Sequence, residues 1–113
     1  MSELLERYLK KIEQKKEKQR LEVLQNVLEA LGKLSKELSF KKAYIFGSIL
    51  KKKRFYYDSD IDIAVAGLAD KDFFLFMSRL GDAVGRNVDI VQLEKHRFKN
   101  KITKDGLLWR RQS

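Results

Sequence analysis

Aspartates alternate with apolar residues in the stretch SDIDIAV, residues 59–65, and this alternation constrains the fold more than any other feature. Successive side chains of a β-strand point to opposite faces of its sheet. The isoleucines and the valine would therefore face a core, while Asp60 and Asp62 face away from it, with Cα atoms roughly 6.6 Å apart. Two ionised carboxylates at that separation repel each other, and burying them without a partner is costly. The stretch predicts a strand whose polar face lines a cleft.

A divalent cation would remove the repulsion between these carboxylates. Magnesium is the natural candidate, since it binds one or two carboxylates, keeps several waters and completes its shell with substrate phosphates. The segment Val88-Asp89-Ile90 repeats the pattern, because its apolar residues flank a single acid. Alone, Asp89 is equally consistent with a strand-end residue that meets a surface lysine. Together with Asp60 and Asp62, it predicts three carboxylates that converge from two neighbouring strands.

A glycine-serine pair, Gly47-Ser48, closes an apolar run shortly before these aspartates. Glycine allows a tight turn, and the free N–H groups of a following helix start can bind phosphate, with the serine hydroxyl adding a bond. An unbroken run of cations, residues 51–54, follows the pair. That run is either a second phosphate contact, made by Lys51 and Lys53, or a solvated loop.

The N-terminal third of the chain has a helical pattern of apolar residues. We expect two helices, roughly residues 3–18 and 21–38, either separate or fused, because the polar segment 13–20 is a solvated bridge or a break. A single helix of that length would reach beyond so small a domain, which favours a partner or a second copy. We therefore divide the chain into a basic amphipathic helical extension, residues 1–20, and a domain, residues 21–113. The candidate contact stripe of the extension is Leu5, Leu9 and Ile12.

The remaining pattern predicts a small sheet with one further helix. We expect that helix from Lys71 to about Val84, with Asp70 as its N-cap and Gly85 at its end. The fold class is therefore α/β (α+β), with a small mixed sheet covered by helices. The expected strands are residues 43–46, 61–66 and 87–93, with a short closing strand at 106–109.

Charge and cysteine content limit the classes of protein. The net charge of +9 is uneven, with +8 on residues 1–54, −4 on residues 55–91 and +5 on residues 92–113. Basic ends are consistent with solvation or with attraction to a polyanion such as a nucleotide or RNA. The chain has no cysteine, which excludes disulfides and thiolate metal sites, and it has no run long enough for a membrane helix. We expect a cytoplasmic protein.

The order of strand, Gly47-Ser48, short gap, Asp60-x-Asp62, strand and later Asp89 resembles the nucleotidyltransferase fold of the DNA polymerase β superfamily. The short chain and the SDIDIAV motif resemble its minimal, MNT-type branch. The family's usual Arg-Ala-Arg-Gly type of segment after the glycine-serine pair is replaced here by ILKKKR, residues 49–54.

This resemblance implies a two-metal transfer of a nucleotidyl group. Gly47 and Ser48 would hold the triphosphate of ATP or another nucleotide, and Asp60, Asp62 and Asp89 would ligate two Mg²⁺ ions. Asp89 would also accept the proton of the attacking hydroxyl as pyrophosphate leaves.

The resemblance also implies a partner. Minimal nucleotidyltransferases are often paired with a HEPN-domain toxin and silence it by adding AMP to a tyrosine, so we expect an enzyme of the protein adenylyltransferase type, with a HEPN protein or RNA as acceptor. The alternative is a catalytically weak binding module of the same fold that holds RNA or a protein partner.

Overall fold

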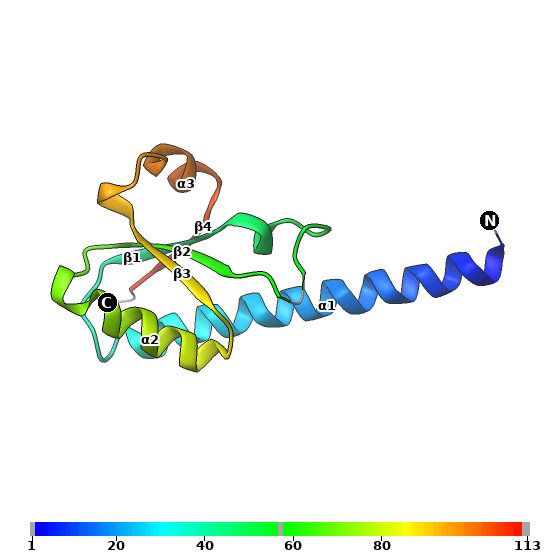
Figure 1. Cartoon of the computed structure of the whole chain (residues 1–113), viewed down its shortest axis with the longest axis horizontal. Helices are drawn as coiled ribbons and strands as arrows, with labels where there is room; N and C mark the ends of the chain where they lie inside the picture. Colours follow the sequence, from blue (N-terminus) through cyan, green and yellow to red (C-terminus); the bar gives the residue numbers. More distant parts are fainter. Residues whose placement is uncertain (1, 57, 112–113) are drawn as a thin grey trace.

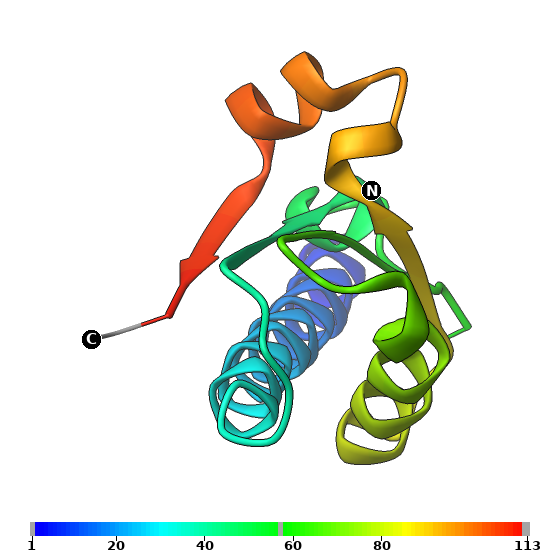
Figure 2. The same cartoon turned by 90° about the vertical axis from the view of Figure 1, so that its left-hand side faces the viewer.

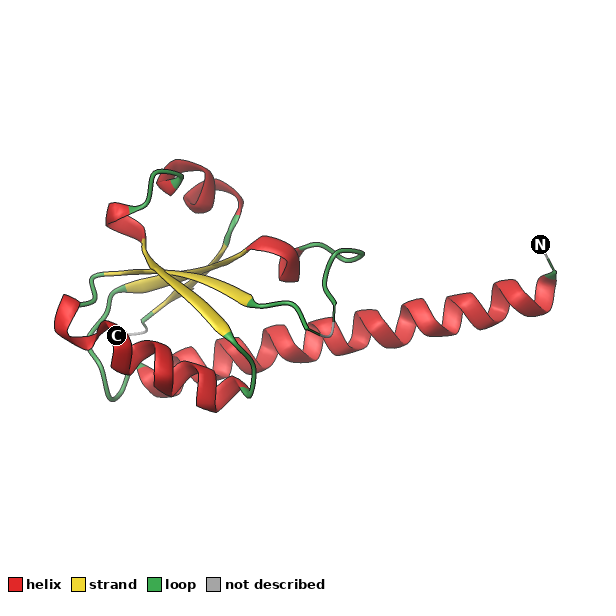
Figure 3. Ribbon diagram, in the orientation of Figure 1, coloured by secondary structure: helices red, strands yellow, loops and turns green. Residues whose placement is uncertain are grey.

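The computed structural model describes residues 2–56 and 58–111. Four strands form one mixed sheet in the order β3-β2-β1-β4. The strands are β1 (Lys42–Phe46), β2 (Ile61–Ala66), β3 (Val88–Gln92) and β4 (Leu107–Arg110). Strand β1 pairs antiparallel with both β2 and β4, whereas β2 and β3 are parallel (Figure 3). The expected α+β class, with a small mixed sheet and an N-terminal helix, is confirmed.

Helices cover the two faces of the sheet unequally. Helices α1 (Glu3–Leu34) and α2 (Phe73–Val84) lie side by side on one face, and α3 (Lys99–Asp105) lies beyond the other face (Figures 1 and 2). The short 3₁₀ turns are η1 (Gly47–Leu50), η2 (Asp70–Asp72) and η3 (Leu93–Lys95). Helix α3 is the element that the sequence reasoning missed, because its seven residues carry too few apolar positions to show a period.

The main core lies between the sheet and the two long helices. The side chains of Ile61, Ile63 and Val65 are fully buried there, as the alternation in β2 predicts. A smaller apolar cluster on the opposite face contains Tyr44, Ala64, Ala66, Leu93 and Ile102. The sheet is therefore covered on both faces at its centre.

The N-terminal segment forms one uninterrupted helix, so the fused alternative is correct and the expected end at residue 38 is wrong. Ser2 caps α1 by accepting the N–H of Leu5 at 3.1 Å, and the helix ends at Leu34. Its N-terminal half projects beyond the sheet, which gives the molecule extents of 56 × 27 × 26 Å (Figure 1). The helix crosses the expected boundary at residues 20 and 21 without interruption, so that division stays a prediction. Within the described residues, no helix is long and apolar enough to cross a membrane.

The expected N-cap of the α2 region is also wrong. Asp70 begins η2, and its carboxylate accepts hydrogen bonds from Gln92 at 2.7 Å and from Lys95 at 3.1 Å. Helix α2 begins only at Phe73, with no side-chain cap. Its end is as expected, because Gly85 adopts a left-handed conformation with φ of 73°. Asp70 thus binds residues at the end of β3 instead of capping a helix.

Candidate active site

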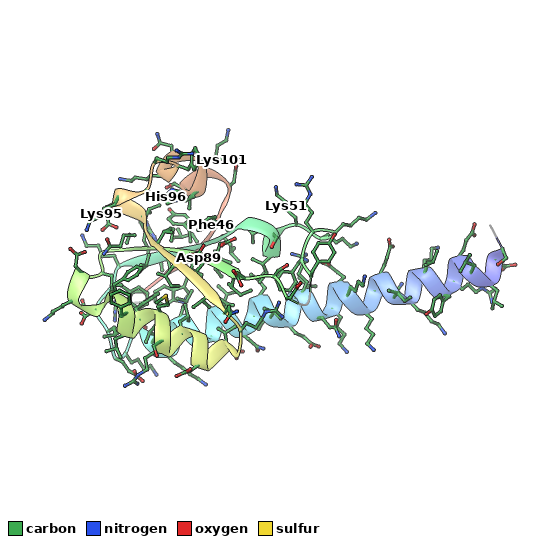
Figure 4. The ribbon with its side chains drawn as sticks, in the orientation of Figure 1. Phe46, Lys51, Asp89, Lys95, His96 and Lys101 are labelled. Carbon is green, nitrogen blue, oxygen red and sulfur yellow. The ribbon has the colours of Figure 1, made fainter. Side chains whose placement is uncertain are left out.

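The candidate site lies where β1 ends, at the sheet face that turns toward α3. Asp62 is the register partner of Phe46 across β1 and of Asp89 across β3. Asp62 shares its strand face with Ala64 and Ala66, which pack on the α3 side, and Asp89 shares its face with Val91, which packs there too. Asp62 and Asp89 therefore leave adjacent strands on the same side, and Figure 4 labels Asp89 on β3.

Asp60 lies just before β2 instead of inside it, and its side chain is exposed. The loop that carries it is held by Arg86, which donates to the carbonyl oxygens of Ser59 at 3.0 Å and Tyr56 at 3.2 Å. The guanidinium also lies 4.7 Å from the centre of the Phe55 ring. Sequence reasoning did not find this role for Arg86, because nothing local to residue 86 links it to a loop so far back in the chain.

Gly47 and Asp62 are in close contact. Gly47 has φ of 84°, a left-handed conformation that favours glycine. A Cβ atom at this position would overlap the Asp62 carboxylate, lying 3.1 Å from its Cγ and closer still to one oxygen. The absence of a side chain at residue 47 is therefore what lets the Asp62 carboxylate lie against the backbone of the β1–η1 turn.

The electrostatics of the site differ from those of the rest of this basic protein. Burial raises the pKa of the partly buried Asp62 above its usual value, and the charges of Asp89 and Asp60 raise it further. Among the described residues, no hydrogen bond or ion pair engages any of the three carboxylates. In a chain of net charge +9, three acids near each other without a cation are an arrangement that an external cation would stabilise.

The predicted phosphate-binding residues come directly after β1 in the chain. Gly47 and Ser48 begin η1, and the partly buried Ser48 is next to the residue that contacts Asp62. Lys51 and Lys53 are both exposed in the turn after η1. Lys51 lines a cavity beside Gly47, and phosphate binding by Lys51 and Lys53 stays a prediction.

Arg20 of α1 holds η1 in place, a role that sequence reasoning missed. Its guanidinium donates to the carbonyl oxygen of Ile49 at 2.7 Å and forms an ion pair with Glu17 at 2.6 Å. The arginine side chain is only 12% exposed. The polar segment 13–20 therefore connects α1 to the site at one point, because its last residue, Arg20, binds η1.

Comparison with known families agrees with this geometry. Residues 29–113 match the family model described as Polymerase beta, Nucleotidyltransferase. The chain belongs to the polymerase beta nucleotidyltransferase family. No curated protein matches the sequence, and no solved structure matches it either. The match contains all four strands and the whole candidate site, so nucleotidyl transfer is the general activity that this nucleotidyltransferase domain suggests, whereas the MNT-type branch and the HEPN partner stay predictions.

This family generally uses Mg²⁺, and the carboxylates of the site decide whether the ion fits here. Within residues 2–56 and 58–111, no three acidic, histidine or cysteine side chains lie close enough to hold one ion between them. Asp62 and Asp89 are nevertheless register partners, and Mg²⁺ needs only one or two carboxylates when phosphates and waters complete its shell. The donor set therefore fits an ion that binds together with a nucleotide, and not a preformed cage of three ligands.

Proposed function

We propose that the protein is a Mg²⁺-dependent nucleotidyltransferase that moves AMP from ATP to a hydroxyl group of a protein or RNA acceptor. The single observation that carries the proposal is the Asp62 carboxylate, which lies against Gly47, has a raised pKa and has no hydrogen bond or ion pair within the described residues. A structural aspartate gains nothing from such a place, because burial and two like charges destabilise its ionised form. A carboxylate that binds a metal cation and faces a triphosphate does gain from this place, because the cation neutralises the repulsion.

The residues take the following roles in this proposal. Asp62, Asp89 and Asp60 hold the ions, which when bound neutralise the triphosphate and lower the pKa of the attacking hydroxyl. The backbone at Gly47 and the hydroxyl of Ser48 orient the triphosphate, and Lys51 and Lys53 add positive charge. Asp89 accepts the proton of the acceptor hydroxyl as its oxygen bonds to the α-phosphorus. The bond from that phosphorus to the bridging oxygen breaks, and pyrophosphate leaves.

The acceptor and the partners are part of the same proposal. The tyrosine of a HEPN-domain toxin is the protein acceptor that the MNT-type resemblance favours, which would make this chain the antitoxin of a toxin–antitoxin pair in the cytoplasm. We also propose that the projecting half of α1 pairs with a second copy. Its apolar residues are uncovered, with Leu4 79%, Tyr8 60% and Leu5 45% exposed.

The test is transfer of label from ATP that carries ³²P at the α-phosphorus, with Mg²⁺ and the protein encoded by the neighbouring gene. We expect label on protein or RNA, and at least about a 100-fold loss of rate in Asp62→Asn, since a lost metal ligand removes several kcal/mol of transition-state stabilisation. Asp82→Asn, an exposed acid of α2, is the matched control and should keep the rate. Equal absence of label in wild type and Asp62→Asn would contradict the proposal.

The second candidate is a catalytically weak module that binds RNA or a protein. It is favoured by the basic ends of the chain and by the lack of a preformed group of three metal ligands within the described residues. A pure RNA-binding module would bind RNA equally well in wild type and Asp62→Asn, with strong salt dependence and without labelled product. That result would support the binding module and contradict the enzyme.

A further inference from the structure

A cavity of about 480 Å³ lies on the α3 side of the sheet, beside the carboxylates. Its size is within the range of about 300 to 1,000 Å³ that is usual for small-molecule sites. The end of β1 and η1 form one wall, and residues 96–106, which include α3, form the other. The apolar lining comes from Phe46, Leu50, Phe98 and Ile102. Figure 4 labels Phe46 and Lys51 on the first wall and His96 and Lys101 on the second.

The cavity borders the candidate active site at two residues, although none of the three carboxylates lines it. Gly47 lines the cavity and is also the residue against which the Asp62 carboxylate lies. Phe46 lines the cavity as well and is the register partner of Asp62 in the sheet. A ligand with phosphates at Gly47 and Asp62 would therefore have the cavity directly next to its phosphate end.

The lining suits a flat ring with polar edges. Phe98 is a large aromatic residue that exposes 51% of its surface, and the Arg97 guanidinium lies 4.5 Å from the centre of its ring. His96 accepts the N–H of Phe98 at its Nδ1 atom, over 3.0 Å, so the neutral ring carries its proton on Nε2. Asp105 adds acceptor oxygens, and Lys51 and Lys101 add positive charge. A nucleobase needs an aromatic surface together with donors and acceptors at its edge.

We propose that this cavity binds the nucleoside of the nucleoside triphosphate, with the base stacked on Phe98 and a polar edge at His96. The inference rests on the proposed function, because it takes the triphosphate to lie at Gly47. It goes further in assigning the segment from His96 to Asp105 as the nucleoside-binding part of the chain. Neither residue type nor spacing singles out that segment in the sequence.

Calorimetry with two probes tests the inference in the presence of Mg²⁺. One probe is α,β-methylene ATP, which binds without transfer, and the other is inorganic tripolyphosphate, which has no nucleoside. We expect Phe98→Ala and His96→Ala to weaken binding of the ATP analogue, by about tenfold or more for Phe98→Ala, because stacking on an aromatic ring contributes this much per base. Binding of tripolyphosphate should stay within about twofold of wild type.

Phe74→Ala is the matched control, since Phe74 is 74% exposed on α2, at the opposite face of the sheet. It should leave both affinities unchanged. Tripolyphosphate that binds wild type as tightly as the analogue, or Phe98→Ala that binds the analogue normally, would overturn the inference alone. If Phe98→Ala raises the KM for the acceptor and keeps normal affinity for the analogue, the cavity binds the acceptor and not the nucleoside. If wild type binds neither probe, the proposed function fails and the inference fails with it.

Discussion

Asp62 illustrates how a single residue can lower the stability of the fold in favour of function. Its pKa is raised in the folded chain above the ordinary value of 3.8, by burial first and then by the charges of Asp89 and Asp60. The folded state therefore keeps a proton on Asp62 at pH values where the unfolded chain has lost it. The resulting stabilisation is complete below the unfolded pKa and is lost as pH rises through the folded pKa. Above the folded pKa, the ionised carboxylate destabilises the fold.

Replacing Asp62 with asparagine should therefore raise the melting temperature at neutral pH without divalent cations. The gain should vanish in acid, below the ordinary pKa of the carboxyl, where Asp62 is protonated in both states of the wild type. Thermal denaturation across pH measures this directly, with Asp82→Asn as the control that leaves the melting temperature unchanged. A melting temperature lowered by Asp62→Asn at pH 7 would mean that the carboxylate has a stabilising partner. Added Mg²⁺ with ATP should stabilise wild type and not the variant.

Alanine substitutions at Gly47 and Gly85 distinguish the effect of backbone strain from the effect of contact with the site. Both have positive φ, but a Cβ at Gly47 would overlap Asp62, whereas a Cβ at Gly85 would meet nothing within 4 Å. We expect Gly85→Ala to lower the free energy of unfolding by about 1–2 kcal/mol and to keep transfer activity. Gly47→Ala should lose at least as much stability and also displace the Asp62 carboxylate, so that activity falls by about tenfold or more. Chemical denaturation and the labelling assay measure the two effects, and equal activity in both variants would contradict the contact.

At the scale of elements, the site is built from turns that distant residues hold. Arg20 of α1 holds η1, and Arg86 from the α2–β3 loop holds the loop before Asp60. Asp70 holds the end of β3 through Gln92 and Lys95. Glu94 of η3 accepts the N–H of Gly67 at 2.9 Å, which lowers the pKa of the glutamate. Most of these bonds join segments that are far apart in the sequence.

Removal of Arg20 should therefore affect both stability and activity. Arg20→Ala leaves the carbonyl oxygen of the buried Ile49 without its donor, and we expect a loss of about 1.5–3 kcal/mol in the free energy of unfolding. Activity should fall because η1 and Ser48 lose their support. Arg7→Ala is the matched control on the same helix, since its ion pair with Glu3 is exposed and contributes at most about 0.5 kcal/mol. Urea denaturation that gives equal losses for the two variants would contradict this role for Arg20.

At the scale of the whole molecule, α1 extends well past the sheet and its apolar residues there have no cover (Figure 1). The first turn is acidic, with Glu3 and Glu6, whereas the segment around Lys15 and Lys16 is basic. Two copies paired antiparallel through this half of α1 would bring each acidic turn near the basic segment of the other. This is the reason for proposing a second copy as the occupant of that surface.

Self-association through α1 can be tested with two variants that add the same charge. Leu9 is 42% exposed on the apolar stripe, and Gln14 lies on the opposite side of the helix. Leu9→Glu should weaken the dimer at least about tenfold, because a buried leucine contributes about 1.5–3 kcal/mol. Gln14→Glu should leave the dimer intact. Sedimentation equilibrium measures both, and a monomeric wild type at all concentrations would rule out this contact.

Much of the fold follows from local pattern. The strand at residues 61–66, the helix end at Gly85 and the closing strand near Trp109 are confirmed because alternation, a glycine at a helix end and an apolar run depend on neighbours in the sequence. The expected N-cap at Asp70 is wrong, since Gln92 and Lys95 compete for its carboxylate. Local propensity is a weak guide wherever a distant residue offers a better partner.

The sequence by itself determined that β2 must place acids on one face and a core on the other, since side-chain direction in a strand alternates whatever surrounds it. It also carried the resemblance that the family match confirms at the level of the superfamily. Only the tertiary structure decided that Asp62 lies against Gly47, that Arg20 and Arg86 hold the turns of the site, and that residues of η1 and α3 line a cavity beside it. Each of these depends on contacts between segments that chain folding brings together, and no local pattern of residues encodes such a contact.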